Sequence, residues 1–477
     1  MGTTVIVKSK INDASVLRKL AKKYSENGRR PILFNFKASS NHILGKGNKL
    51  NRDAQYIHYY PGRIFPYIPL YILTINDFAG LKGYVLDLFA GSGTILLESI
   101  INPAVKRNAL GVEINPLGRL ISKVKTTPLD IKKIEQNLHV LSSLYKNATN
   151  TNDEIPDFKN SELWFSENSN KKLARLKYAI RILSVGSKYK DFFWVCFSSI
   201  IRKVSKANPY IPPPVVLKPE KYINSPRRYQ RLKEKLEHAE NPDVWKKFEE
   251  VVHKNKNKLS LLNKFDELKN RNIRSQIIWD DARNIKKGQL CECGRMDKQS
   301  AIEFPSNSID LIFTSPPYIT AQKYIRTSKL ELFWLGYSEK EISILEKSSI
   351  GTESTRKKSK ISSLGIESID SVIDYAVPHS FERALTVFKY FRGMMEALAE
   401  MHRLLKDNGY TILVLGNNRV LRRRVETYRL LADAAIEIGF TEIGILKDTI
   451  RSRSMMTKRN GTGGIIKDEY VIILKKA

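Results

Sequence analysis

Cysteine is scarce in this chain, with three residues among 477, and the sequence contains no long apolar run. So few cysteines exclude a disulfide-stabilised scaffold and favour a reducing compartment. The absence of any run of about 18 apolar residues argues against a membrane-spanning helix, and the N-terminal residues lack the apolar stretch of a signal peptide. We therefore expect a cytoplasmic protein, in the cytosol or nucleoid of a prokaryote, that does not act in a membrane.

Acidic residues are also few relative to basic ones. Lys and Arg number 81 against 49 Asp and Glu, which gives a formal net charge of +32 and a pI near 9.8. This imbalance favours a polyanionic partner, either nucleic acid or an anionic membrane, and the lack of apolar runs makes nucleic acid the better choice. Hydrophobic residues make up 42% of the chain, enough for a sizeable core, which excludes a wholly disordered chain.

The order of the apolar runs predicts a doubly wound α/β sheet. A buried strand at 83–89 leads through the turn AGSGT into a helix at 95–101, and a second strand at 108–114 contains an acid near its end. This succession of strand, glycine-rich turn, helix and strand is how a Rossmann-like sheet begins. Further elements are expected as strands at 275–279, 308–313, 410–415, 441–446 and 469–474 and helices at 381–405 and 428–438, with the last two strands forming a terminal antiparallel hairpin.

Polar segments interrupt this pattern and divide the chain. Residues 1–50 are polar and basic and are interpreted as an N-terminal arm with a short helix at 16–24. Residues 121–275 form a basic, mainly helical insertion, and between 201 and 275 they hold 19 basic and 9 acidic residues, a local net charge of +10. Residues 336–380 form a second insertion. The sheet domain would comprise the remaining segments, 51–120, 276–335 and 381–477.

The glycine-rich turn is paired with an acid at the end of the next strand. Glycines at 91 and 93 allow the backbone to approach a ligand closely, and Glu113 follows Gly93 by 20 residues. A carboxylate in that place accepts hydrogen bonds from ribose hydroxyls, so the pair predicts a site for a nucleoside-containing cofactor. The spacing differs from G-x-G-x-x-G, which disfavours a dinucleotide, and no Lys follows the glycines, which excludes a P-loop.

A second motif, Thr314-Ser-Pro-Pro-Tyr318, directly follows the strand at 308–313. Its two prolines fix φ and lack backbone N–H groups, so they stiffen a short loop at the sheet edge where α/β proteins bind ligands. Ser315 and the free carbonyls would accept hydrogen bonds, and the Tyr318 ring offers a face on which a base can stack. Such a loop can hold an exocyclic amino group and leave its nitrogen lone pair free. Taken alone, it is also compatible with a proline-rich turn around a packed tyrosine.

These motifs resemble those of the amino-methylating, S-adenosylmethionine-dependent DNA methyltransferases. The sequence DLFAGSG resembles their cofactor loop, and Ser-Pro-Pro-Tyr resembles their catalytic loop. Members whose catalytic loop begins with Ser mostly methylate cytosine N4, and those with Asp or Asn mostly methylate adenine N6. Further segments that resemble the family are His58–Pro66, Asp280–Arg283, Tyr324–Gly336, Leu404–Asn418 and Arg451–Leu474, so the resemblance covers about 51–120 and 276–477.

The resemblance implies a class I methyltransferase sheet, S-adenosyl-L-methionine as cofactor and double-stranded DNA as partner, with a cognate restriction endonuclease as a further partner. It implies that Asp87 helps to hold the ammonium end of the cofactor and that the region between the two motifs recognises the target. The implied catalytic residues are Ser315, Pro316, Pro317 and Tyr318, and the implied cofactor-binding residues are Asp87, Phe89, Ala90, Gly91, Gly93, Thr94, Glu113, Ile114, Asp281, Ala282 and Pro66.

Several other functions remain open at this point. The same machinery would serve adenine-N6 methylation, and related folds methylate RNA bases, although fewer than 60 residues precede the segment that resembles the cofactor region. A non-catalytic DNA-binding protein on the same scaffold is a third alternative. Cys291 and Cys293 have no second ligand pair nearby, so no metal is expected. The sequence has no Pro-Cys dipeptide, so a covalent route to cytosine C5 has no candidate nucleophile.

Overall fold

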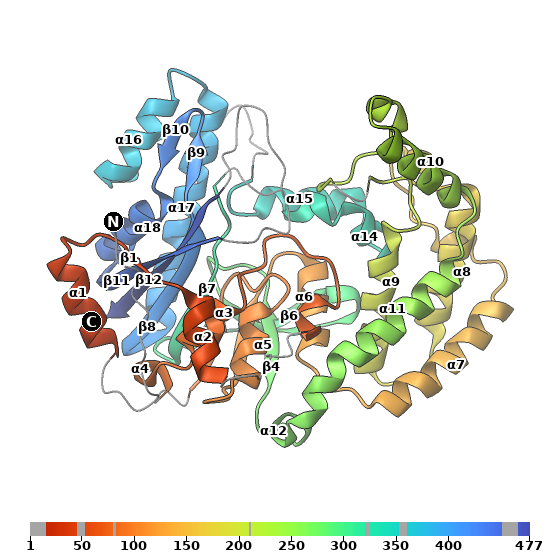
Figure 1. The fold of residues 1–477 in the computed structure, drawn as a ribbon, viewed down its shortest axis with the longest axis horizontal. Helices are drawn as coiled ribbons and strands as arrows, with labels where there is room; N and C mark the ends of the chain where they lie inside the picture. The colour runs from red at the N-terminus through yellow and green to blue at the C-terminus, as the bar shows by residue number, and fades with distance from the viewer. Residues whose placement is uncertain are drawn as a thin grey trace.

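An eight-stranded mixed sheet forms the centre of the protein in a computed structural model (Figure 1). The structure describes residues 16–44, 53–79, 83–208, 211–319, 324–352, 360–450 and 466–477. Across the sheet, the strands follow the order β1 (Ile32–Leu33), β11 (Phe440–Thr449), β12 (Asp468–Lys476), β8 (Leu405–Gly416), β7 (Ile309–Thr314), β2 (Val85–Asp87), β3 (Ala109–Val112) and β4 (Ser275–Trp279).

The direction of the strands reveals a switch point in the topology. Strands β8, β7, β2, β3 and β4 run parallel, while β12 is antiparallel to both of its neighbours. The chain moves outward from β2 to β3 and β4, and then returns to β7 on the other side of β2. Doubly wound sheets bind ligands at such a reversal, outside the carboxyl ends of the strands. The predicted doubly wound sheet with a terminal antiparallel hairpin is confirmed.

Continuous apolar sequence explains why the central strands form where they do. Every residue of β2 and β3 is buried, as expected for parallel strands covered on both faces. Helices α5 and α3 pack together near β2 and β3, and helices α17 and α18 pack together against β8. The helices near the sheet are α2 (Phe36–Leu44), α3 (Tyr67–Ile72), α4 (Asn76–Ala79), α5 (Thr94–Ile101), α6 (Pro116–Lys125), α16 (Glu367–Ala376), α17 (Phe381–Leu404) and α18 (Thr427–Ile438) (Figure 1).

The N-terminal segment interpreted as an arm lies against the sheet edge where the structure describes it. Helix α1 (Val16–Glu26) packs on β11, and β1 extends the sheet by pairing with β11. Arg29 forms an ion pair of 2.9 Å with Glu442 of β11, and Arg429 donates a hydrogen bond of 2.7 Å to the Tyr24 hydroxyl. The described part of this segment therefore packs against the sheet.

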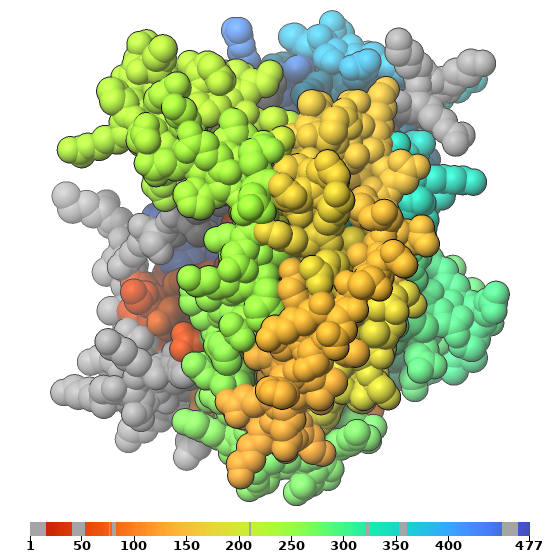
Figure 2. Space-filling model, turned by 90° about the vertical axis from the view of Figure 1, so that its right-hand side faces the viewer, coloured from red at the N-terminus to blue at the C-terminus, as the bar shows by residue number. Residues whose placement is uncertain are grey.

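The basic insertion forms a helical block beside the sheet, visible on the right of Figure 1 and across the face shown in Figure 2. Its helices are α7 (Ile131–Asn147), α8 (Glu167–Ile182), α9 (Ser187–Ile201), α10 (Pro226–Glu240), α11 (Val244–Leu259) and α12 (Asp266–Lys269). The rings of Phe165 and Phe197 meet the Trp334 ring edge-on at 5.7 and 6.2 Å. The block thus shares a core with the helix that follows the Ser-Pro-Pro-Tyr loop. The domain bounds expected from the sequence remain predictions.

Smaller elements complete the fold. Three helices follow the Ser-Pro-Pro-Tyr loop: α13 (Tyr324–Thr327), α14 (Lys329–Trp334) and α15 (Glu339–Ser348). Two hairpins, which the sequence did not predict, are β5 (Lys286–Leu290) with β6 (Met296–Glu303) and β9 (Asn418–Val420) with β10 (Arg423–Val425). The 3-10 turns are η1 (Asp53–Tyr56), η2 (Asn152–Glu154), η3 (Ser161–Leu163), η4 (Pro219–Tyr222), η5 (Ser260–Lys264) and η6 (Glu292–Gly294). No helix among the described residues is long and apolar enough to cross a membrane.

Candidate active site

The carboxyl ends of β2 and β7 meet at the switch point and carry polar side chains. Strand β2 ends at Asp87, and β7 ends at Thr314. Thr314 Oγ1 donates a hydrogen bond of 2.6 Å to Asp87 Oδ1, and both side chains are buried. The N–H of Phe89 donates to the same two oxygens, at 3.1 Å to Asp87 Oδ1 and 3.0 Å to Thr314 Oγ1. The starts of the two predicted loops are therefore held against each other.

The Asp87 carboxyl lies in an environment that disfavours its charge. Burial raises the pKa of Asp87 to about 7, even though hydrogen bonds from Thr314 and from the Phe89 N–H act to lower it. The nearby Glu113 carboxyl raises this pKa further, and no cation is among the described neighbours that influence it. A positively charged ligand at this point would favour the ionised form and would be attracted by it.

The glycine-rich turn adopts a backbone that needs glycine at two positions. Gly91 has φ of 52° and Gly93 has φ of 76°, in the left-handed region that residues with a Cβ rarely enter. A Cβ on Gly93 would also collide with the Ser122 side chain of α6. The N–H of Ala90 donates a hydrogen bond of 2.9 Å to the Val112 carbonyl at the end of β3. The turn is thus closely packed, and buried Thr94 begins α5 directly after it.

Glu113 contacts the turn directly, as its place in the sequence predicted. Its Oε2 accepts a hydrogen bond of 2.6 Å from the Gly91 N–H, and its Oε1 accepts one of 2.7 Å from the Asn115 N–H. Burial raises the pKa of Glu113, while these two hydrogen bonds lower it. A carboxylate has about four acceptor positions, so Glu113 keeps capacity for the hydroxyls of a ligand. Ile114 follows it, half-buried, with its carbonyl accepting from Arg119 at 3.1 Å.

The next strand end, after β4, is occupied by internal ion pairs. Asp281 forms two hydrogen bonds of 2.9 Å with the Arg283 guanidinium, so its carboxylate is largely engaged. Ala282 is buried behind it. Asp280 is buried too, and it pairs with Lys298 at 2.9 Å and with Arg119 at 3.7 Å. The structure therefore places Asp281 and Ala282 next to the end of β3, but it shows no contact that joins them to Glu113.

The segment His58–Pro66 lies over the turn through one aromatic side chain. Tyr60 is buried against Gly91 and Glu113, and its hydroxyl would be 3.0 Å from a Cβ placed on Gly118 of α6. Burial is the main reason that the pKa of Tyr60 lies well above its ordinary value. Pro66 precedes α3 at its N-cap, farther along the same segment.

The Ser-Pro-Pro-Tyr loop is supported from the neighbouring strand β8. Ser315 Oγ donates a hydrogen bond of 2.9 Å to the Val414 carbonyl, which leaves its lone pairs free to accept. Asn418 Nδ2 donates a hydrogen bond of 2.8 Å to the Ile319 carbonyl just after the loop. Pro316 is buried, while Pro317 and Tyr318 are half-buried. Burial is the main cause that raises the pKa of Tyr318 well above its ordinary value.

Three residues that contribute to this site were not among the predicted ones. Thr314 was seen as part of its motif, but its hydrogen bond to Asp87 depends on the pairing of β7 with β2. Arg119 is buried, and it donates hydrogen bonds of 2.8 Å to the Glu113 carbonyl and 2.7 Å to the Gly294 carbonyl. Glu469 lies opposite Gly416, and burial and the Asp448 charge raise its pKa to about 7. No motif marks the last two residues: the hydrogen bonds of Arg119 on α6 and the strand pairing of Glu469 reveal them.

The described residues contain no group of three or more His, Cys, Asp or Glu side chains that could hold a metal ion. Of the two cysteines considered for zinc, Cys291 is exposed and Cys293 is partly buried.

One edge of the sheet does bring together several of the predicted features: Asp87, the glycine-rich turn, Glu113 and the Ser-Pro-Pro-Tyr loop. This edge can bind a ligand that combines a positive charge with hydroxyl groups, beside a rigid loop of hydrogen-bond acceptors.

Comparisons with known proteins agree with this geometry. No family model matches the chain. The chain is 24% identical to the Type II methyltransferase M.MvaI of Kocuria varians, over 97% of both sequences. It is also 24% identical to the Type II methyltransferase M.BsoBI of Geobacillus stearothermophilus, over 78% of this chain and 76% of that protein. The resemblance to DNA methyltransferases of restriction-modification systems therefore extends through the basic insertion.

A likeness to solved structures is much weaker. It was found with a protein assigned as a DNA modification methylase of Thermus thermophilus, solved in complex with S-adenosyl-L-methionine. The match is 16% identical, has a TM-score of 0.19 and covers 36% of this chain and 49% of the solved one. The chain thus matches about half the length of that protein.

The raised pKa of Asp87 predicts how a neutral substitution changes the pH dependence of stability. Its folded-state pKa of about 7 lies above the ordinary value of 3.8. Ionisation therefore favours the unfolded chain, and Asp87 contributes a loss of stability to the wild type as the pH rises from 4 to 7. In Asp87→Asn this loss disappears. The free energy of unfolding of the variant minus that of the wild type should therefore rise by on the order of 4 kcal/mol between pH 4 and pH 7.

Urea unfolding of both proteins at pH 4, 5, 6 and 7, without ligand, measures this difference. The exposed Asp153→Asn serves as a control for loss of a carboxyl. A difference that stays constant with pH, as large at pH 4 as at pH 7, would show that the pKa of Asp87 is not raised in the folded protein.

Proposed function

We propose that this chain is a DNA methyltransferase that transfers a methyl group from S-adenosyl-L-methionine to the exocyclic N4 of cytosine in duplex DNA. The observation that carries the proposal is the hydrogen bond between Thr314 and Asp87, which sets the Ser-Pro-Pro-Tyr loop beside the glycine-rich turn. Similarity to a Type II methyltransferase over 97% of both chains supports DNA methylation, without favouring either base. The proposed enzyme would act in the cytosol, beside a cognate restriction endonuclease.

The residues at the strand ends fit S-adenosyl-L-methionine. Buried Asp87 lacks a cationic neighbour among the described residues, and the ammonium of the cofactor would supply one. Glu113 would accept from the ribose hydroxyls, and Gly91 and Gly93 keep the turn free of side chains. Asp281 and Ala282 would border the adenine, although Asp281 must share its oxygens with Arg283. When bound, the cofactor supplies an electrophilic methyl group.

The Ser-Pro-Pro-Tyr loop would hold the nucleophile. Because the Ser315 proton is directed to the Val414 carbonyl, its oxygen lone pairs remain available for the amino hydrogens of a base. The Pro316 carbonyl would accept a second hydrogen, and the Tyr318 ring would stack on the base. An amino nitrogen is unreachable inside a duplex, so the target base must rotate out of the stack. The loop contributes positioning, together with stabilisation of the nitrogen as it becomes positive.

Cytosine N4 is preferred over adenine N6 because the loop begins with Ser315. The resemblance to families with Ser in this position supports that choice, and adenine N6 remains the second candidate. The remaining site residues, Phe89, Ala90, Thr94, Ile114 and Pro66, would line the cofactor pocket or shape its entrance.

Residues 121–275 are proposed to contact the DNA and to read its sequence. Helix α10 presents exposed Arg227 and Arg228, and the Arg228 guanidinium lies 3.9 Å from the centre of the Tyr222 ring. Cations on an exposed helix neutralise phosphates or reach base edges in the major groove. The second insertion, 336–380, is the alternative location for sequence reading.

Modified-base detection tests the proposed function directly. DNA from cells that express the chain is sequenced by a method that distinguishes N4-methylcytosine from N6-methyladenine, and nucleosides from digested DNA are identified by mass spectrometry. The proposal expects N4-methylcytosine at one short sequence and none in the same cells without the chain. N6-methyladenine would transfer the proposal to the second candidate, and modified RNA with unmodified DNA would contradict it.

The turn predicts a specific loss of cofactor affinity. Gly91→Val places a branched side chain at a positive φ and beside the Tyr60 ring, 3.5 Å from the Cβ position. The affinity for S-adenosyl-L-methionine, measured by calorimetry, should fall at least tenfold. The matched control is Gly28→Val, which has φ of 62° and nothing within 4 Å of its Cβ position. Equal affinities for the two folded variants would remove the turn from the cofactor site.

The catalytic loop predicts a loss of rate without loss of cofactor binding. Tyr318→Ala removes the stacking surface, which contributes about 1–3 kcal/mol per base, so single-turnover methylation should slow by roughly 5- to 150-fold. Tyr318→Phe keeps the ring and should stay within a few-fold of the wild type. If Tyr318→Ala transfers the methyl group at the wild-type rate, the loop is only a turn.

A further inference from the structure

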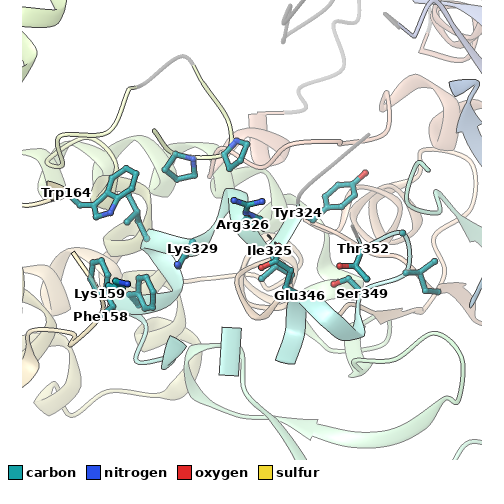
Figure 3. Close-up of a pocket in the computed structure, with 16 residues that line it drawn as sticks. Phe158, Lys159, Trp164, Tyr324, Ile325, Arg326, Lys329, Glu346, Ser349 and Thr352 are labelled. Atoms are coloured by element: carbon teal, nitrogen blue, oxygen red, sulfur yellow. Dashed lines mark ion pairs between the residues drawn. The ribbon is translucent and has the colours of Figure 1, made fainter. Parts of the chain in front are cut away.

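A pocket of about 670 Å³ lies beside the proposed base-binding loop, between the helical insertion and helices α13 to α15. Figure 3 shows Trp164, Phe158 and Lys159 on one side of this pocket, Tyr324, Ser349 and Thr352 on the other, and Arg326 and Lys329 between them. Pro213 and Pro214 of the insertion complete the lining near Trp164. None of Ser315, Pro316, Pro317 or Tyr318 lines it, so it is separate from the site described above.

The pocket nevertheless borders the catalytic loop. Gly351 belongs to its lining, and a Cβ on Gly351 would lie 3.8 Å from the Tyr318 carbonyl. Tyr324 also lines the pocket, and it is close enough to Tyr318 and Glu113 to influence the pKa of Tyr318 and to be influenced by Glu113. Whatever occupies this pocket is therefore an immediate neighbour of the group bound by the loop.

The aromatic side chains of the pocket differ in how they are packed. The Phe158 and Phe333 rings stack on each other, with centroids 4.0 Å apart and an interplanar angle of 7°, and both residues are buried. Trp164 is only half-buried, and its ring stacks on no other ring in the part of the chain that the structure describes. A half-buried indole ring without a stacking partner, in the wall of a polar pocket, offers a surface on which a nucleobase can stack.

The cationic side chains that line the pocket outnumber the acidic ones. Lys159, Arg326 and Lys329 contribute three cations, and Glu346 is the one acidic residue of the lining. Arg326 and Glu346 pair at 3.7 Å, while Lys159 and Lys329 form no ion pair with any described residue. Lys329 instead lies over the Phe333 ring, 5.3 Å from its centre. Two unpaired ammonium groups in one pocket favour a phosphate as part of the ligand.

We propose that this pocket binds a single nucleotide of the target DNA strand, next to the nucleotide whose base enters the Ser-Pro-Pro-Tyr loop. This proposal rests on the proposed function. The phosphate would lie between Lys159 and Lys329, and the base would stack on Trp164. A volume of about 670 Å³ suits a small ligand and not a duplex, so the neighbouring base would also leave the helical stack. A duplex backbone that merely crossed the rim would contact the cations and leave Trp164 unused.

Photochemical cross-linking locates the nucleotide. The DNA probe is a duplex that carries the sequence found by modified-base detection, with 5-iodouridine at single positions on either side of the target base. Peptide mass spectrometry after irradiation should map a cross-link to Trp164 from one of the two positions adjacent to the target on the same strand. Cross-links to Trp164 from the opposite strand only, or from no position, would overturn the proposal.

Matched variants test the contribution of the lining to binding. Lys159→Ala with Lys329→Ala should weaken DNA binding at least tenfold relative to Lys22→Ala with Lys23→Ala, which removes the same charge from the exposed side of α1, outside the proposed DNA-contacting region. Trp164→Ala should weaken it by a similar factor, and Trp164→Phe should restore most of the affinity. Cofactor affinity should stay at the wild-type value in all of them.

The two proposals fail in different ways. Absence of methylation by the wild type contradicts the proposed function. Wild-type methylation together with pocket variants that bind DNA as well as their controls contradicts only the nucleotide site.

Discussion

A buried hydrogen bond of 2.6 Å between Thr314 and Asp87 joins the ends of two parallel strands, β7 and β2. Each residue begins one of the loops on which the proposed chemistry depends. Because parallel neighbours end at the same edge of a sheet, the pairing of these strands brings together motifs that lie 227 residues apart. The hydrogen bond also satisfies a carboxyl whose burial raises its pKa to about 7. Its loss would leave that carboxyl buried with one fewer donor, a costly arrangement in a protein interior.

The rest of the site is arranged around this junction. Glu113 reaches back to the Gly91 N–H, which fixes the glycine-rich turn against the end of β3. Ser315 donates to β8, so the Ser-Pro-Pro-Tyr loop is fixed from the opposite side. The helical insertion shares its core with α14, and the pocket between them opens beside Tyr318. A rigid sheet edge, a rigid loop and a cationic, aromatic pocket are thus contiguous, as transfer to a base held outside its helix would require.

Much of the sheet could be predicted because its central strands are buried on both faces. Such strands appear as continuous apolar runs, as in β7, which was predicted at 308–313 and is observed at Ile309–Thr314. The edge strand β4 also has the bounds that its sequence predicted, Ser275–Trp279. The β5–β6 hairpin was missed because its sequence is polar and mostly exposed, so it has no apolar signature. Strand β1 has two residues, too few for any pattern, and the packing of the N-terminal segment on the sheet is seen only in the contacts of β1 and α1 with β11.

The candidate site could be predicted only in part, for a related reason. Local motifs marked Asp87, the glycines, Glu113 and the Ser-Pro-Pro-Tyr loop. Contacts that depend on strand pairing, such as Ser315 with Val414 or Arg119 with Gly294, have no local signal. The pocket draws its lining from residues between 158 and 352, and no periodicity in the sequence connects Trp164 with Lys329.

The Thr314–Asp87 hydrogen bond is tested most directly by Thr314→Val in a double-mutant cycle with Asp87→Asn. Valine keeps the shape of threonine and removes the hydroxyl. The measured quantities are S-adenosyl-L-methionine affinity and single-turnover methylation. If the bond couples the two loops, Thr314→Val lowers both, and the two substitutions show a coupling energy of about 0.5–3 kcal/mol. Wild-type values for Thr314→Val, or strictly additive effects, would contradict the account.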